Sequence, residues 1–338
     1  MSRTDRLTAD LERGFEALEE GNVDAAAAIV ERCRKIDSKN PDVVTLAAAV
    51  ADARGDAVEA LAQYRSLVKL RPDDPMPRIC VARLELHDLG DPDAALDTVD
   101  AAFDFIDEEA DLVEAIYVKT EALLIRGDAA EARQALSELA SSVVDDAELA
   151  LDLAELAIAA EDPVGATRWI EAARKADPEM EADALHALGR VHELTDHKAA
   201  MVAAWQQVRL LDAKAPPPAI QVSDDRVEQI ALATLAELPA NIRAHLERVP
   251  ILIDELPSEE LVADGLDPRL LGLFQGSPMP EDGALAPTVT NILLFKRNLE
   301  REALDEDHLA EEIRITVLHE TAHYFGLDED DLEKLGLD

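Results

Sequence analysis

The feature that most restricts the fold of this 338-residue chain is a repeat of about 34 residues. Within residues 1 to 212, a residue suited to a turn recurs at Gly21, Gly55, Gly90, Gly127, Glu161 and Thr195. The intervals are 34, 35, 37, 34 and 34 residues. Such a period holds two helices and a turn, and each helix pair must bury its apolar face against its neighbours. The repeat therefore predicts about six helix pairs stacked into an α-solenoid.

Two further positions keep the same spacing. One residue after each turn comes a residue able to cap the next helix, at Asn22, Asp56, Asp91, Asp128, Asp162 and Asp196. Five residues after each turn comes an alanine, at Ala26, Ala60, Ala95, Ala132, Ala166 and Ala200. Small side chains at a fixed position let paired helices approach closely. The helices of each pair should therefore pack through these alanines.

This pattern resembles the tetratricopeptide repeat, whose period is also 34 residues. Residues 55–64 (Gly-Asp-Ala-Val-Glu-Ala-Leu-Ala-Gln-Tyr), followed by Leu70-Arg-Pro72, give the best match, whereas the family's Trp-Leu-Gly-Tyr pattern is mostly absent. We therefore term the region tetratricopeptide-like. The resemblance implies a concave face that docks a peptide or protein partner, and a spacer or dimerisation arm is the alternative.

A proline cluster separates this region from the rest of the chain. Pro216 to Pro218 favour an extended, semi-stiff backbone. We expect helical repeats over residues 1–212, a linker over 213–222 and a second domain over 223–338. In that domain the pattern predicts an amphipathic helix over 225–238, strands over 249–254 and 290–296, and a short strand or turn over 271–276. The expected fold class is mostly α, with a solenoid followed by a small α+β domain.

The second domain contains the sequence His319-Glu320-x-x-His323, which is expected by chance roughly 0.02 times in a chain of this composition. Asp305 is a candidate cap of the helix that carries it. On a helix, positions i and i+4 share a face, so two imidazoles can bind one metal ion. Glu320 can then take a proton from a water at the metal. The pattern predicts zinc-dependent peptide hydrolysis.

Zinc needs a third protein ligand. Glu329 lies ten residues after His319, where zincins of the H-E-x-x-H-x-x-G-x-x-H type place their third histidine. Asp328 and Asp330 remain alternatives. The non-metal interpretation is an amphipathic helix with two histidines and an acidic tail.

Several stretches resemble the small bacterial zincin-like metallopeptidases with an H-E-x-x-H-x-x-G-x-x-D signature. They are residues 249–257, 271–276, 290–297 and 316–332, in about a third of the chain. The resemblance implies a minimal zincin fold with one zinc ion held at His319 and His323 and a peptidase site completed by Glu320. Glu329 stands where the family usually has aspartate. It also implies that an edge strand, residues 290–296 or a neighbour, pairs with an extended substrate.

The net charge of the chain restricts the kinds of partner that it can bind. The formal net charge is -41, from 32 basic and 73 acidic residues. We therefore expect neither nucleic acid nor an anionic membrane as a partner.

No apolar run is long enough to span a bilayer, and the polar N-terminal residues lack the apolar core of a signal peptide. We therefore expect a cytoplasmic protein. Cys33 and Cys80 have no metal-like spacing and should be buried free thiols.

The predicted function is a zinc metallopeptidase that cleaves peptide or protein substrates, with the repeats docking a substrate or partner. The alternative is a non-enzymatic tetratricopeptide-like scaffold with a structural or degenerate zinc site. A weaker possibility is a site for another divalent metal, because oxygen ligands are abundant. Tyr324 is the nearest candidate for stabilising an oxyanion.

Other conspicuous residues are not expected to belong to the site. Trp169 and Trp205 should belong to the solenoid core. His192 and His197 are five residues apart and are not expected to bind metal.

Overall fold

The computed structural model describes residues 3–246, 249–276 and 291–325. The chain forms two compact units, Met1–Pro178 and Glu179–Asp338. The expected fold class, a helical solenoid with a small α+β region, is confirmed. The limits 1–212, 213–222 and 223–338 stay predictions, because a division by contacts does not test which parts fold alone.

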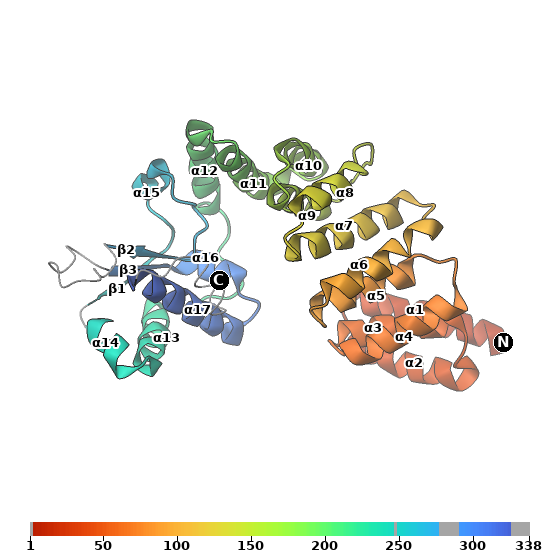
Figure 1. Ribbon diagram of the computed structural model, residues 1–338. Helices are drawn as coiled ribbons and strands as arrows, with labels where there is room; N and C mark the ends of the chain where they lie inside the picture. The colour runs from red at the N-terminus through yellow and green to blue at the C-terminus, as the bar shows by residue number, and fades with distance from the viewer. Residues whose placement is uncertain (1–2, 247–248, 277–290, 326–338) are drawn as a thin grey trace. The chain divides into compact units, whose positions relative to one another are not determined.

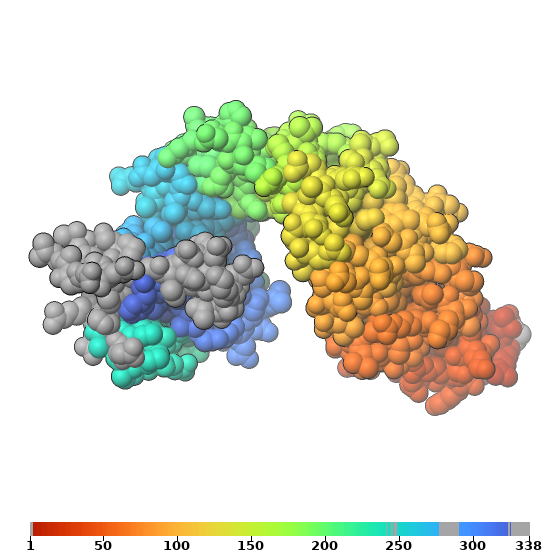
Figure 2. All heavy atoms as spheres, in the orientation of Figure 1, coloured from red at the N-terminus to blue at the C-terminus, as the bar shows by residue number. Residues whose placement is uncertain are grey.

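The first unit consists of helix pairs. The pairs are α1 (Arg3–Glu19) and α2 (Val23–Asp37), α3 (Pro41–Ala53) and α4 (Ala57–Leu70), α5 (Met76–His87) and α6 (Pro92–Asp100), α7 (Glu109–Ile125) and α8 (Ala129–Ser137), and α9 (Ala147–Ala159) and α10 (Pro163–Ala176). Each pair packs against the next along the chain. Short 3-10 turns follow α6 and α10, at Phe103–Phe105 and Pro178–Met180. In the space-filling view the colours of this unit follow one another in chain order, as expected where repeats contact only their neighbours (Figure 2).

The predicted turns are confirmed in five of the six repeats. A positive φ occurs at Gly21, Gly55, Gly90, Gly127 and Glu161. The alanines five residues later are fully buried: Ala26, Ala60, Ala95, Ala132 and Ala166. The capping side chains accept a backbone N–H at Asn22, Asp56, Asp91 and Asp162. Asp128 makes no such bond and pairs with Arg126 instead.

The sixth turn differs from the prediction by one residue. The positive φ, 56°, falls on Asp196 rather than Thr195. The buried position five residues later is accordingly Met201, whereas Ala200 is only half-buried. The cap position falls on His197, whose side chain makes no capping bond. The repeat therefore keeps its structural period but loses its alanine and its acidic cap here.

The second unit begins with the last helix pair. Its elements are α11 (Glu181–Leu194), α12 (Lys198–Asp212), α13 (Asp224–Glu237), α14 (Ala240–Leu246), β1 (Ile251–Asp254), α15 (Glu259–Asp264), β2 (Gly272–Gln275), β3 (Asn291–Phe295), α16 (Lys296–Glu302) and α17 (Glu306–Tyr324). The predicted helix over 225–238 corresponds to α13, and the predicted strands over 249–254 and 290–296 correspond to β1 and β3. Of the two alternatives for residues 271–276, the structure has the strand, β2. None of the described helices has the length and apolar character needed to cross a bilayer.

The three strands form one sheet in the order β1-β3-β2 (Figure 1). β3 pairs in parallel with β1, with Ile251 opposite Ile292, and antiparallel with β2, with Leu273 opposite Leu293. All five residues of β3 are buried. Of the two expected edge positions, residues 290–296 are therefore excluded, and the neighbouring strand β2 lies at an edge of the described sheet.

The core of this unit joins helices to the sheet. It contains apolar residues of α13, β3, α16 and α17, namely Val227, Ala231, Leu235, Ile292, Leu294, Leu299, Leu309, Ile313 and Val317. The stripe formed by Leu309, Ile313 and Val317 recurs every four residues along α17, so one face of this helix is fixed against the core. The two histidines, His319 and His323, lie near the C-terminal end of this helix.

The proline-rich segment is held against the second unit. Arg297 donates to the carbonyls of Ala215 and Pro216, and the N–H of Val222 donates to Glu300 over 2.9 Å. Ile220 also packs on the core of the unit. Residues 215–222 contain neither helix nor strand, and these contacts hold both ends of the segment on the unit.

The last helix pair is attached by buried charges. Arg269 donates to Asp183 of α11 over 2.6 Å and to Asp212 of α12 over 3.1 Å, and Asp212 is 4 % exposed. Nε2 of His186 lies 2.9 Å from both carboxylate oxygens of Asp267. Because these groups link α11 and α12 to the loop before β2, this pair packs as part of the second unit.

The two cysteines and two tryptophans lie where the sequence predicts. Cys33 and Cys80 are buried free thiols. Trp169 and Trp205 are each 2 % exposed and belong to the packed interior of their repeats. These four side chains therefore have structural roles.

Candidate active site

Helix α17 is defined at its start by a side-chain cap. Asp305 accepts a hydrogen bond of 2.8 Å from the N–H of His308, as predicted, and Glu306 and Asp307 add favourable negative charge to the first turn. The helix then continues to Tyr324, which places His319 and His323 on successive turns near its end.

The two histidines converge. Their Nε2 atoms lie 3.0 Å apart, and their ring planes make an angle of 77° with centroids 4.7 Å apart. Two imidazole nitrogens on one tetrahedral zinc ion, each at about 2.05 Å, would lie roughly 3.3 Å apart. The pair therefore fits two positions of a zinc site. Without a metal, one neutral ring can donate its N–H to the other over the same distance.

Glu320 lies beside this pair and is 6 % exposed. Its Oε2 accepts a hydrogen bond of 2.5 Å from the backbone N–H of Phe274 in β2. Successive helix residues are separated by 100°, so Glu320 faces the sheet edge while remaining next to the histidine face. This hydrogen bond fixes the carboxylate against β2.

The backbone N–H and C=O groups of successive β2 residues point alternately toward β3 and away from it. The N–H of Phe295 donates to the carbonyl of Leu271, so in the antiparallel register Leu273 and Gln275 also direct their backbone groups toward β3. Gly272 and Phe274 direct theirs away from β3, and the bond from Phe274 to Glu320 agrees with this alternation. The outer side of β2 therefore faces the candidate catalytic carboxylate.

Gly272 makes this close approach possible. A Cβ atom built there would lie 2.5 Å from Cγ2 of Thr316 and 3.1 Å from Cγ of Glu320. Only glycine lets β2 pack this tightly on α17. The contacts of Gly272, Phe274 and Thr316 were not predicted from the sequence. An isolated glycine between apolar strand residues is a signal of close backbone approach, although it does not identify the partner.

The predicted third ligand, Glu329, and its alternatives Asp328 and Asp330 lie outside the described residues. So does the side chain of Tyr324. Within residues 3–246, 249–276 and 291–325, no group of three His, Cys, Asp or Glu side chains could hold a metal ion. The described part of the site consists of His319, Glu320 and His323, and the ligand set stays a prediction.

Sequence comparison agrees with both halves of this architecture. Residues 246–337 match the family model described as zincin-like metallopeptidase. The C-terminal region is zincin-like. Residues 17–84 match a model of the tetratricopeptide repeat. The resemblances to the two families are therefore confirmed. A search of curated proteins found no match to the chain.

Solved structures share the helical-repeat fold. One is PilW, described as a widely conserved type IV pilus biogenesis factor, at 15% identity with a TM-score of 0.53, covering 62% of this chain and 94% of PilW. Another is pilF of Pseudomonas aeruginosa, at 15% identity with a TM-score of 0.50, covering 63% of this chain and 95% of pilF. At this identity the likeness shows the fold alone.

Proposed function

We propose that the chain is a zinc-dependent metallopeptidase whose helical repeats dock a substrate or protein partner. The observation that carries the proposal is the convergence of the His319 and His323 nitrogens to 3.0 Å beside the buried carboxylate of Glu320. A purely structural zinc site has no need of a buried carboxylate next to its ligands. The zincin-like family match supports the same chemistry.

His319 and His323 would hold the zinc through neutral ring nitrogens, with Glu329 as the proposed third ligand. A bound zinc ion supplies Lewis-acid polarisation of the scissile carbonyl and makes a water more acidic. Glu320 takes the proton of the attacking water and transfers it to the nitrogen of the leaving amine. The N–H of Phe274 orients that carboxylate from the sheet side.

The strand β2 would position the substrate. The N–H of Phe274 is already used by Glu320, so the outward-facing backbone of Gly272 is what an extended peptide would pair with through main-chain hydrogen bonds. A peptide bound there would run past Glu320, close to the two histidines of the same helix. The edge is β2, not β3, because β3 is covered on both sides by its neighbours.

The test is hydrolysis by wild type and Glu320→Gln with zinc present, using unfolded casein and a mixture of quenched fluorescent peptides. We expect Glu320→Gln to lose about 10²–10⁴-fold in rate, because general acid–base catalysis contributes that much. Glu311→Gln is the matched control, since Glu311 is exposed on the same helix and pairs with Arg314. Equal rates for wild type and Glu320→Gln would refute the proposed role. A wild type without hydrolysis of any substrate would favour the scaffold alternative.

A further inference from the structure

Two histidines meet at the turn between α11 and α12, within the second unit (Figure 1). The ring centroids of His192 and His197 lie 6.2 Å apart, and the ring planes make an angle of 75°. Five positions on one continuous helix would separate the two side chains by about 140°. Helix α11 ends at Leu194, however, so helix spacing does not describe how these two rings are placed.

The backbone of the turn brings the rings together. The N–H of His197 donates to the carbonyl of His192 over 2.8 Å, and Asp196 has a positive φ of 56°. This is the Schellman arrangement at the end of a helix, in which the side chains of the two bonded residues commonly contact each other. The meeting of the two rings therefore follows from the backbone motif.

The same backbone bond occurs in other repeat turns, where it joins different side chains. It joins Asn22 to Ala17, Asp56 to Ala51, Asp128 to Leu123 and Asp162 to Ala157. Among the described turns with this bond, the one after α11 has two imidazoles at these positions, and His197 makes no capping bond to α12. A cap usually stabilises a helix, so its loss here indicates a role other than packing.

Thr195 determines which nitrogen of one ring carries the hydrogen. Its hydroxyl has a single hydrogen, which it donates to the carbonyl of Val191 over 2.8 Å, with that of His192 at 3.3 Å. The hydroxyl oxygen also lies 2.8 Å from Nδ1 of His197, so it accepts the hydrogen of that nitrogen. In the neutral ring the lone pair is then on Nε2. An acceptor at the other ring nitrogen is the usual support of a histidine that binds a metal.

The separation of the rings suits a shared ion. With a metal–nitrogen distance of about 2.05 Å, two imidazoles on one ion have ring centres roughly 4.5–6.4 Å apart, depending on the angle at the metal. The observed 6.2 Å lies within this range. Within the described residues, no hydrogen bond ties the half-buried ring of His192 to another group. This ring can therefore turn toward an ion held by Nε2 of the exposed His197.

The charges at the turn favour a cation. Glu193 and Asp196 are exposed carboxylates next to the two histidines in sequence. Lys198 also adjoins them, but its Nζ lies 3.7 Å from the position of a Cβ atom on Gly265, so its amine lies beside the end of α15. The net charge of -41 adds a general attraction for cations.

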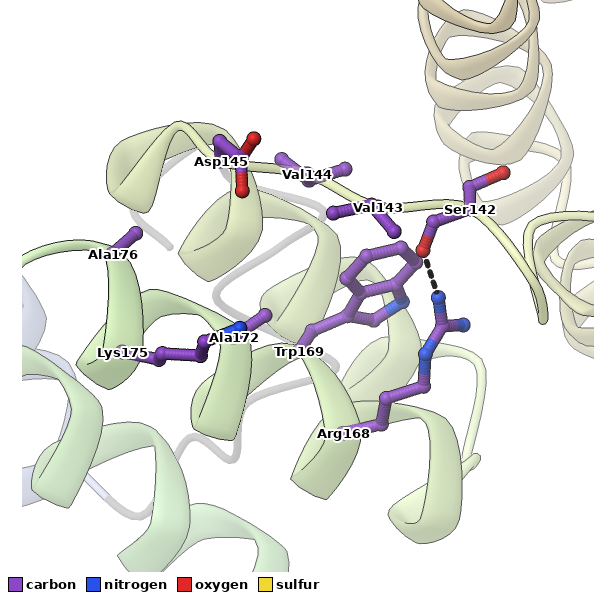
Figure 3. Close-up of a pocket in the computed structure, with 9 residues that line it drawn as sticks. All are labelled: Ser142, Val143, Val144, Asp145, Arg168, Trp169, Ala172, Lys175 and Ala176. Carbon is purple, nitrogen blue, oxygen red and sulfur yellow. Dashed lines mark hydrogen bonds between the residues drawn. The ribbon is translucent and has the colours of Figure 1, made fainter.

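A pocket in the first unit lacks this chemistry. It has a volume of about 230 Å³, lies between residues 142–145 and α10, and is lined by Arg168, Lys175 and one carboxylate, Asp145 (Figure 3). None of its described lining residues is a histidine or a cysteine. The two cations there oppose a metal ion, so Asp145→Asn is a negative control for metal binding.

We propose that His192 and His197 bind one divalent late transition-metal ion, such as Ni²⁺, Cu²⁺ or Zn²⁺, separately from the zinc site proposed on α17. Imidazole nitrogens suit these ions, whereas Mg²⁺ and Ca²⁺ prefer oxygen ligands. The described residues offer this pair no third His, Cys, Asp or Glu side chain, so water completes the coordination. The site therefore binds its ion reversibly and does not act as a structural zinc site.

The probe is Ni²⁺ alone, titrated by calorimetry into the full-length chain with His323→Ala, which breaks the other histidine pair. We expect one Ni²⁺ ion per chain. Adding His192→Asn or His197→Asn should weaken binding at least about tenfold, because one of two imidazole ligands is lost. His87→Asn is the matched control, since it removes an exposed imidazole of the first unit and should leave the Ni²⁺ affinity unchanged.

Thermal unfolding separates metal binding from packing. Ni²⁺ should raise the Tm of His323→Ala, because the ion binds the folded pair. Adding His197→Asn should abolish this gain and raise the Tm without metal, since Asn22 caps the helix at the equivalent position of the first repeat. Thr195→Val should weaken Ni²⁺ binding about tenfold and Thr195→Ser should restore it, because the hydroxyl orients the ring.

Three results would overturn the proposal. One is the absence of saturable Ni²⁺ binding to His323→Ala at concentrations up to about 1 mM. Another is unchanged affinity in both His192→Asn and His197→Asn, with circular dichroism to confirm that the variants fold. The third is competition by Mg²⁺ as strong as that by Zn²⁺, because carboxylates would then be the ligands. None of these results depends on peptidase activity, which Glu320→Gln tests separately.

Discussion

Gly272 decides how closely β2 approaches the candidate catalytic helix. We predict that Gly272→Ala destabilises the protein by about 1–3 kcal/mol, as overpacking does, because the new Cβ would lie 2.5 Å from Cγ2 of Thr316. Since the same Cβ meets Glu320, zinc-dependent hydrolysis should fall as well. Urea unfolding and the peptidase assay measure the two effects.

The second variant, Gly272→Ala with Thr316→Ser, is the control for this prediction. Serine lacks the Cγ2 methyl group that causes the closest contact, so stability should recover in part. If Gly272→Ala alone leaves both stability and hydrolysis unchanged, β2 does not pack on α17 as described.

The residues of the candidate site differ in how far sequence predicts them. His319, Glu320 and His323 follow from local spacing, because the geometry of one helix turn brings them together. The bond from Phe274 to Glu320 joins residues 46 positions apart and depends on the strand register. Local spacing contains no information about that register, so this contact required the structure.

At the level of helices and turns, the turn of the fifth repeat differs from the first four in having no glycine at the positive-φ position. Four repeat turns have glycine at the positive-φ position, but Glu161 takes it at 54°. A residue with a Cβ atom is strained there, so we predict that Glu161→Gly stabilises the protein by roughly 0.5–1 kcal/mol. The ion pair lost with Arg133 is exposed and 3.6 Å long, and contributes little.

Glu161→Ala is the matched control, since it removes the carboxylate but keeps the Cβ atom. Thermal unfolding should show a gain in Tm for the glycine variant alone. A decrease in Tm for Glu161→Gly would contradict the strain argument.

The pair of His186 and Asp267 should make stability depend on pH. Burial opposes ionisation of Asp267, but the hydrogen bond and charge of His186, with the N–H and charge of Arg269, lower its pKa below the usual 3.8. A lowered pKa in the folded state stabilises the protein above the unfolded pKa, and this stability is lost as pH falls through the folded value. Asp267→Asn should therefore be less stable than wild type at neutral pH.

The free energy of unfolding of Asp267→Asn, measured with urea, should approach that of wild type as pH falls below about 4. Asp264→Asn removes the same charge from an exposed position nearby and should follow wild type at every pH. A constant difference between Asp267→Asn and wild type would show that ionisation of Asp267 is not the cause.

The elements themselves were largely predictable, and their arrangement was not. The apolar pattern predicts α13, β1 and β3, whereas residues 271–276 are compatible with either a short strand or a turn. The unbroken run Ile292-Leu-Leu-Phe295 is a signal of a strand buried on both faces, and such a strand favours the neighbour as the edge. The turn at Asp196 was misplaced by one residue because threonine and aspartate are both plausible turn residues.

On the scale of the whole molecule, the chain combines helical repeats with a zincin-like region. The sequence predicts this combination because one half repeats and the other does not. It does not predict that the last helix pair packs with the second unit, since Arg269 and Asp267 meet α11 and α12 only in the folded chain. A zinc ion would link the two histidines of α17 to residues beyond that helix, so metal content tests the architecture and the chemistry together.

The most direct test is the zinc content of purified wild type, Glu320→Gln and His323→Ala by elemental analysis. The account predicts one zinc ion per chain in wild type and in Glu320→Gln, because Glu320 is not a ligand, and none in His323→Ala. Wild-type protein that contains no zinc after reconstitution, or His323→Ala that retains a full equivalent, would contradict the proposed metal site.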